Sequence, residues 1–237
     1  MRLYGYWRSS SSWRVRIALE YKRISYELVP VDLLNQTGAE WRESFVDKNP
    51  MAQVPLLEIF ESDGPPSESR PRRSDPGGDE VPDSGPTERV IRISQSIAIL
   101  EYLEELYPDP ALLPSEPTER ALARQIAETV NAGMQPFQNL RVQAVLKDRG
   151  LEPLPFVTEF LTRGFLAVEQ VAKGCAGRFL VGDSVTFADV CMVPQLYSAR
   201  RLGVSLDQYP TLLRCDEACA ELESFQRARP EVQPDAR

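Results

Sequence analysis

Four consecutive serines, Ser9 to Ser12, stand between a predicted strand over residues 2–6 and a predicted helix over residues 15–21. A helix N-terminus offers unpaired backbone N–H groups and the positive end of the helix dipole. Hydroxyl groups at that point can help to stabilise an anion or a thiolate. A serine there can also do no more than cap the helix, so the run alone leaves both interpretations open.

Two further short motifs, Val54-Pro55 and Gln95-Ser96, lie where a predicted strand and a predicted helix begin. Val54-Pro55 precedes a predicted strand over residues 56–60, where a proline starts an edge strand or adopts the cis bond. The main chain of Val54 could then pair with a bound peptide. Gln95-Ser96 opens a predicted helix and could hold a carboxylate. A plain turn proline and simple capping are the alternatives.

Other kinds of chemistry are excluded by residues that the chain lacks. It contains no histidine, which removes the Ser-His-Asp and Cys-His systems and the commonest metal ligand. The four cysteines form no C-x-x-C pair, and Cys215 and Cys219, one helical turn apart, are interpreted as ordinary helix residues. We therefore predict no metal site and no thioredoxin-type redox couple.

The net charge and the hydropathy of the chain limit the classes of partner that it could bind. The formal net charge is −8, which argues against a broad basic face for nucleic acid or anionic lipid. No apolar run approaches the roughly 18 residues that span a bilayer, and the N-terminus does not resemble a signal peptide. We expect a cytoplasmic protein with no nucleic-acid partner and no membrane partner.

The hydrophobic pattern predicts two domains. The first is an α/β unit over residues 1–107, with strands over 2–6, 25–33, 56–60 and 90–93 and helices over 15–21, 41–46 and 97–106. A stretch of Pro, Gly, Ser and charges over 61–88 is interpreted as a disordered insertion in its hairpin. A proline-marked linker over 108–117 follows. Residues 118–237 are predicted to be all-α, beginning with one long helix over 118–146 that kinks near Gly133 and Pro136.

Together these elements resemble a known family, the cytosolic glutathione transferases, and within it the zeta class. The class signature S-S-C-S-x-x-V-R-I-A-L is matched by residues 9–19, and further matches lie at 49–55, 95–103, 135–140 and 187–195. The serine motif and residues 135–140 make the class specific, because other classes share only the Val-Pro, Gln-Ser and Ala-Asp elements. The resemblance covers nearly the whole chain except 61–88. It implies a thioredoxin-like N-terminal domain, an all-α helical C-terminal domain, glutathione as cofactor and a homodimer.

The resemblance also implies a reaction and the residues that serve it. The reaction is glutathione-dependent cis-trans isomerisation of maleylacetoacetate to fumarylacetoacetate in phenylalanine and tyrosine catabolism, by thiolate addition, bond rotation and elimination. Ser9 is the implied activating hydroxyl, with Ser10 and Ser11 beside it as catalytic residues. The implied cofactor-binding residues are Ser9, Ser10, Ser11, Ser12, Trp13, Val54, Pro55, Gln95, Ser96, Gln135 and Asn139. Arg8 and Arg201 are the candidates for the substrate carboxylate and the transient enolate, with a one-residue shift to Arg200 left open.

The energetics of such a site are feasible without histidine. Lowering the pKa of a free thiol from about 8.5–9 to about 6.5 requires near 3 kcal/mol. A hydroxyl that donates to a charged sulfur contributes about 1.5–3 kcal/mol, and a helix N-terminus adds about 1–2 kcal/mol. One serine at a helix start is therefore sufficient in principle.

One departure and two alternatives accompany the resemblance. Ser11 stands where the class signature has cysteine, which leaves the turnover rate and the preferred substrate open. The nearest alternative is a zeta-class glutathione transferase that acts mainly on α-haloacids. The second alternative is a non-enzymatic binding module with the glutathione-transferase fold. We assign Thr186 and Asp189 a structural role, because Thr186-x-x-Asp189 has the form of a capping box at the start of an apolar helix.

Overall fold

The computed structural model describes residues 1–33, 45–62 and 88–237. Its elements are β1 (Arg2–Gly5), α1 (Ser10–Tyr21), β2 (Glu27–Pro30), β3 (Leu56–Ser62), β4 (Glu88–Ser94), α3 (Ser96–Leu106), α4 (Pro117–Gly133), η1 (Gln135–Gln138), α5 (Leu140–Asp148), α6 (Pro153–Ala172), α7 (Phe187–Arg201), α8 (Pro210–Ala220), α9 (Glu223–Ala228) and η2 (Pro230–Val232). None of the helices within these ranges is long and apolar enough to cross a membrane. The same ranges contain no cluster of side chains that could hold a metal ion.

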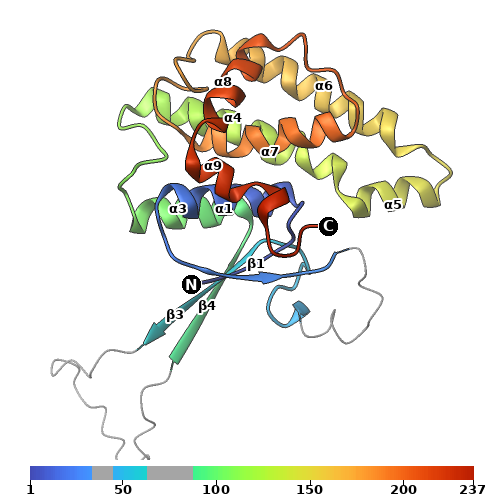
Figure 1. Cartoon of the computed structure of the whole chain (residues 1–237). Helices are drawn as coiled ribbons and strands as arrows, with labels where there is room; N and C mark the ends of the chain where they lie inside the picture. Colours follow the sequence, from blue (N-terminus) through green and yellow to red (C-terminus); the bar gives the residue numbers. More distant parts are fainter. Residues whose placement is uncertain (34–44, 63–87) are drawn as a thin grey trace, which may run out of the picture.

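The N-terminal part is a four-stranded mixed sheet in the order β2-β1-β3-β4. β1 pairs in parallel with β2 and antiparallel with β3, which forms a hairpin with β4. Leu3 and Leu57 pair across β1 and β3, and both are fully buried. Figure 1 shows α1 and α3 between this sheet and the remaining helices. The predicted order of an α/β domain followed by an all-α domain is confirmed.

Helix α1 is buried over most of its length because both domains pack against it. It contacts α3 in its own domain and α7 and α9 in the helical domain. Ile17 of α1 belongs to the same hydrophobic cluster as Val130 of α4 and Phe187 of α7. The two domains therefore share one core, and the start of α1 is held at the boundary between them.

The predicted long helix over residues 118–146 is broken rather than kinked. Helix α4 ends at Gly133, the short 3-10 helix η1 follows, and α5 begins at Leu140. Pro136 cannot donate to the α4 ladder, and the side chain of Asn139 accepts a hydrogen bond from the backbone N–H of Arg141, which starts a new helix. The break places η1 and the start of α5 beside the N-terminal domain.

Several predicted boundaries also move. The strand expected over 25–33 is limited to β2, whereas β3 and β4 are longer than expected, so Glu61 pairs with Arg89 and Ser62 pairs with Glu88. These margins of the predicted insertion are therefore strand, and residues 63–87 lie outside the described ranges. Residues 41–44 of the short helix predicted over 41–46 also lie outside them.

Candidate active site

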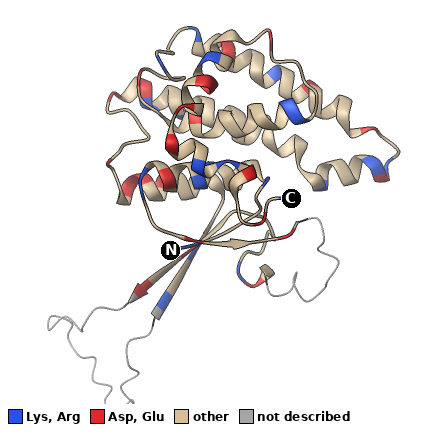
Figure 2. Ribbon diagram, viewed as in Figure 1, with Lys and Arg blue, Asp and Glu red and all other residues tan. Residues whose placement is uncertain are grey.

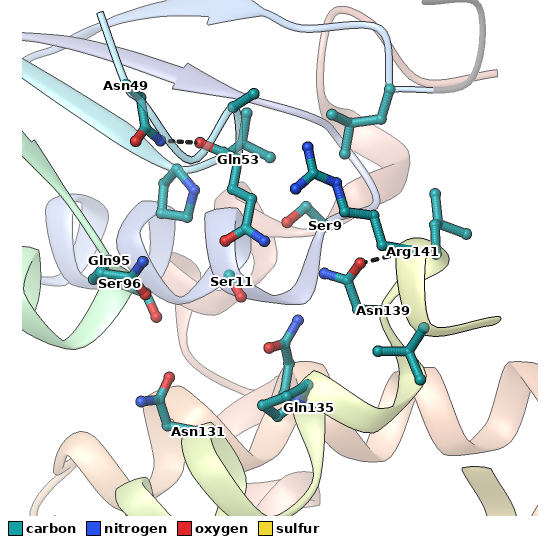
Figure 3. Close-up of a pocket in the computed structure, with 17 residues that line it drawn as sticks. Ser9, Ser11, Asn49, Gln53, Gln95, Ser96, Asn131, Gln135, Asn139 and Arg141 are labelled. Carbon is teal, nitrogen blue, oxygen red and sulfur yellow. Dashed lines mark hydrogen bonds between the residues drawn. The ribbon is translucent and has the colours of Figure 1, made fainter. Parts of the chain in front are cut away.

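A pocket of about 550 Å³ lies where the two domains meet. It is bordered by the turn between β1 and α1, the turn before β3, the start of α3 and the region from α4 to α5 (Figure 3). Its lining residues are Ser9, Ser11, Leu33, Asn49, Ala52, Gln53, Val54, Pro55, Gln95, Ser96, Asn131, Gln135, Pro136, Asn139, Leu140, Arg141 and Val142. Eight residues predicted from the sequence are thus brought together: Ser9, Ser11, Val54, Pro55, Gln95, Ser96, Gln135 and Asn139.

Ser9 is the N-cap of α1. Its Oγ accepts a hydrogen bond of 3.2 Å from the backbone N–H of Ser12, and its own backbone has the extended conformation typical of a cap. A hydroxyl has one proton and two lone pairs, so the proton of Ser9 remains available to a group in the pocket. Both interpretations of the serine run, capping and anion binding, are therefore compatible at this one residue.

Ser10, Ser12 and Trp13 are not among the residues that line this pocket. All three are buried, because successive residues of a helix point in different directions and α1 is covered on most sides. Trp13 packs edge-on against Tyr197 with ring centroids 5.2 Å apart, and it lines a separate cavity of about 290 Å³ between α1 and the helical domain. The resemblance implies that these three residues contact the cofactor. Their burial away from this pocket does not favour a direct side-chain contact, which stays a prediction.

The turn before β3 presents main-chain groups to the pocket. The Val54-Pro55 bond is cis, one of the two conformations expected from the sequence. Buried Asn49 orders this turn by donating to the carbonyl of Gln53 at 2.6 Å and accepting from the backbone N–H of Met51 at 3.2 Å. The backbone N–H and carbonyl of Val54 have no hydrogen-bond partner among the described residues. They are free to pair with an extended ligand.

The start of α3 presents a helix N-terminus to the pocket. Gln95 has φ of 74°, a conformation uncommon outside glycine, and its side chain makes no capping bond. The hydroxyl of Ser96 accepts a hydrogen bond of 3.1 Å from the buried guanidinium of Arg14. Both side chains line the pocket, next to the unpaired backbone N–H groups of the first turn.

The helical domain closes the opposite wall. Gln135 lies in η1 and Asn139 caps α5, so the break in the predicted long helix is what brings both to the pocket. This segment is tied to α7 by a reciprocal pair of amide hydrogen bonds between Gln138 and buried Gln195, at 3.1 and 3.4 Å. Phe137 stacks on Phe160 of α6 with centroids 3.7 Å apart. The wall is therefore fixed by packing on two helices.

The two candidate arginines for substrate lie outside the lining set. Arg8 stacks over the Trp7 ring at 5.1 Å from its centroid. The pKa of Arg201 is lowered first by burial and then by the positive charge of Arg8. Arg200, by contrast, forms an ion pair of 2.7 Å with Asp216 of α8. Arg200 is thus engaged with α8, and the assignment of Arg201 to the substrate stays a prediction.

Sequence reasoning did not assign four polar residues of the pocket to the site: Asn49, Gln53, Asn131 and Arg141. Gln53 immediately precedes the predicted Val54-Pro55 pair, so its position was a usable signal. Arg141 is the one charged side chain among the described lining residues, and its guanidinium points back over the pocket toward Ser9 (Figure 3). Elsewhere acidic and basic residues are interspersed over the helices (Figure 2). Arg141 therefore gives the pocket a local positive charge within an acidic chain.

None of the four cysteine thiols lines this pocket. Cys191, Cys215 and Cys219 are buried, and burial raises the pKa of the Cys191 and Cys215 thiols to about 11. Such thiols are protonated and unreactive at neutral pH. In the described part of the chain, any sulfur chemistry in the pocket must come from a bound molecule.

Comparison with known proteins adds the following findings. Residues 8–106 match the model of the glutathione S-transferase N-terminal domain, and residues 157–223 match that of the C-terminal domain. The chain is 43% identical to maleylacetoacetate isomerase of Rattus norvegicus over 98% of this chain and 94% of that protein. It is 38% identical to a zeta-class glutathione S-transferase of Euphorbia esula over 100% of this chain and 92% of that protein. A crystal structure of maleylacetoacetate isomerase from Anaeromyxobacter dehalogenans, with glutathione bound in its active site, superposes with a TM-score of 0.82 at 45% identity, covering 100% of this chain and 97% of that one.

Proposed function

Because this chain belongs to the zeta class of the glutathione S-transferase family, we propose that it is an enzyme that isomerises maleylacetoacetate to fumarylacetoacetate with glutathione as cofactor. The observation that carries the proposal is the pocket itself. In one cavity it joins a serine hydroxyl at a helix start, the free main chain of Val54 and the N-terminus of α3. These three features match the thiol, the peptide backbone and the carboxylate of a γ-glutamyl tripeptide.

The residues present fit glutathione part by part. Ser96 and Gln95 stand at a helix N-terminus, which suits the γ-glutamyl carboxylate. The unpartnered N–H and carbonyl of Val54 suit the cysteinyl main chain, which would pair with them as an added strand does. The cavity of about 550 Å³ lies within the usual range of about 300–1,000 Å³ for small-molecule sites. Gln135 and Asn139 face the same space from the helical domain.

Bound glutathione would supply a thiolate that adds to the cis double bond of the substrate and leaves after rotation about the resulting single bond. Ser9 would stabilise that thiolate by donating its hydroxyl proton to the sulfur, aided by the α1 dipole. The family resemblance assigns Arg8 and Arg201 to the substrate carboxylates and to the negative charge that would develop on the carbonyl oxygen. Arg141, above Ser9 in Figure 3, is placed to assist them from the other wall.

The proposal is tested by an isomerisation assay on the wild type and Ser9→Ala, with and without glutathione. We expect turnover of maleylacetone by the wild type only when glutathione is present, and a large loss of turnover in Ser9→Ala. Absence of glutathione-dependent isomerisation in the wild type would overturn the proposed function. Unchanged activity in Ser9→Ala would retain the function and remove Ser9 as the activating group.

The same assay separates the two alternatives. Faster turnover of dichloroacetate than of maleylacetone would make the protein a transferase acting mainly on α-haloacids. Glutathione binding without thiol transfer to any electrophile would make it a binding module.

We further propose that the enzyme acts in the cytoplasm as a homodimer, as the resemblance implies. Exposed apolar side chains of the N-terminal domain support an interface: Phe60 and Val90 pair across β3 and β4, and Leu106 lies at the end of α3. Sedimentation analysis of the wild type and of Phe60→Glu is expected to show a dimer that the substitution weakens. A monomeric wild type would contradict this part of the proposal.

A further inference from the structure

A guanidinium is buried directly beneath the pocket. Arg14 of α1 is fully buried, and its Nη1 donates to the hydroxyl of Ser96 at 3.1 Å and to the amide oxygen of Asn131 at 2.9 Å. Ser96 belongs to the N-terminal domain and Asn131 to the helical domain, and both line the pocket. One cation therefore links the two walls of the site from behind.

Arg14 forms no ion pair within the part of the chain that the structure describes, and Glu128 reaches it only through Asn131, which donates to that carboxylate at 3.3 Å. Its two recorded partners are neutral, and its Nε and Nη2 have no hydrogen-bond partner among the described residues. Burial lowers the pKa of Arg14, and the opposing influences of Cys191 and Glu128 are smaller. A buried cation without a paired anion is costly, so the fold tolerates this residue at some expense to stability.

A second buried arginine on the same helix provides a comparison. Arg16 is also fully buried, and its Nη1 likewise has no hydrogen-bond partner among the described residues. Its Nε donates to the carbonyl of Ala228 at 3.1 Å and its Nη2 to the carbonyl of Trp7 at 2.8 Å. These partners are main-chain groups that do not line the pocket. Arg16 therefore ties segments of the chain together, whereas Arg14 directs its charge at two pocket residues.

We propose that Arg14 is a positioning residue that supplies the countercharge for the α-carboxylate of the γ-glutamyl group and acts on it through Ser96. This inference rests on the proposed function, because it assigns that carboxylate to the start of α3. When Arg14 donates to the Ser96 oxygen, the Ser96 proton is directed to another acceptor, and the pocket is the open side. The guanidinium polarises this hydroxyl and attracts an anion across a short, low-dielectric path.

The inference predicts an affinity that depends on one chemical group of the ligand. Two probes isolate that group. The tripeptide 4-aminobutyryl-Cys-Gly lacks only the α-carboxylate of glutathione, and glutaryl-Cys-Gly lacks only the α-amine. If Arg14 acts on the carboxylate, its removal weakens the binding of glutathione and glutaryl-Cys-Gly but leaves the weak binding of 4-aminobutyryl-Cys-Gly nearly unchanged.

Calorimetric titration of the wild type, Arg14→Met and the matched control Arg16→Met tests this. The measured quantity is the ratio of glutathione affinity to 4-aminobutyryl-Cys-Gly affinity. We expect the ratio to fall about tenfold in Arg14→Met, the size of one charge-assisted interaction, and to change less than about twofold in Arg16→Met. An unchanged ratio in Arg14→Met would overturn the inference, because a purely structural residue would weaken both ligands alike.

A second variant, Arg14→Lys, and the glutathione affinity of the wild type complete the test. Where Arg14→Met does not fold, Arg14→Lys replaces it, and the ratio is expected to fall about threefold because an ammonium lacks the forked geometry that holds both partners. An unchanged ratio in that variant would overturn the inference equally. Wild-type protein that binds no glutathione would instead overturn the proposed function, so the two failures are distinct.

Discussion

The backbone N–H of Ser12 donates to Ser9 Oγ at 3.2 Å, which makes the proposed thiol-activating hydroxyl also the N-cap of α1. The cap fixes the position of the oxygen and leaves its proton free. Placement of the sulfur-binding group and stability of the helix are therefore determined by the same side chain. The two contributions can be separated, because capping requires only an acceptor whereas thiolate stabilisation requires a donor.

Two variants of Ser9 separate its helix-capping role from its proposed stabilisation of the thiolate. Ser9→Ala removes both properties and is expected to lose about 1 kcal/mol of unfolding free energy, as for other N-cap deletions, together with most of the turnover. Ser9→Asp keeps a capping acceptor, so its stability is expected within a few tenths of a kcal/mol of the wild type. Its carboxylate repels a thiolate, and turnover is expected to fall about a hundredfold or more. Urea unfolding and the isomerisation assay measure the two effects. Ser9→Asp with near-normal turnover would show that the hydroxyl proton is not used.

Restoring a thiol at Ser11 is expected to make the pocket chemically sensitive. Ser11 lines the cavity in the first turn of α1, where a helix N-terminus lowers a thiol pKa. We expect Ser11→Cys to bind glutathione within about twofold of the wild type, because the change in side-chain volume is small. The variant should lose activity with a thiol-modifying reagent, with glutathione protecting it. The wild type is the control, since none of its own thiols lines the pocket. Equal inactivation of both proteins would contradict the prediction.

The neighbouring arginines at the end of α7 form a matched pair. Arg201→Met is expected to raise the KM for maleylacetone and lower kcat, because it removes a cation proposed to hold the substrate carboxylate. Arg200→Met breaks the 2.7 Å ion pair with Asp216 and should reduce stability while leaving kcat/KM within about twofold. Steady-state kinetics and thermal melting of both variants make the comparison. The reverse pattern would assign the substrate to Arg200.

Local sequence rules identified the parts of the site that stand at element boundaries. Ser9, Val54 and Ser96 each begin or precede an element, so capping preferences and proline geometry point to them without knowledge of the tertiary fold. The resemblance added Gln135 and Asn139. The structure places all five around one pocket, which capping rules alone did not predict.

The residues that were missed or misplaced depend on tertiary packing. Which of Ser10, Ser12 and Trp13 faces ligand is set by the rotation of α1 between two domains, and this rotation is not encoded in the serine run. Arg14 was unrecognised because a charged residue in a helix is normally exposed, and only the packing of both domains against α1 buries it. Arg141 became visible only when the helix predicted over 118–146 proved to be broken, which turned a mid-helix position into the first turn of α5.

The capping box at the start of α7 predicts a pH-dependent stability. Asp189 accepts from the backbone N–H of Thr186 at 2.8 Å and from that of Leu180 at 2.9 Å, and the Thr186 side chain caps the helix, as predicted. Burial raises the pKa of Asp189 from 3.8 to about 6. Because the folded pKa is above the unfolded one, protonation favours the folded state. The contribution is complete below about pH 4 and is lost as pH rises through about 6.

An amide at this position mimics the protonated acid and cannot titrate. The unfolding free energy of the wild type, taken relative to Asp189→Asn, is therefore expected to decrease between about pH 4 and 6 and to stay constant above pH 7. Asp189→Ala should lose about 1 kcal/mol or more at every pH, since it leaves buried N–H groups without a partner. Urea unfolding at a series of pH values measures both effects. Asp189→Ala protein that melts normally but has lost turnover would contradict the structural assignment, because Asp189 lies outside the pocket and is expected to affect activity only through folding.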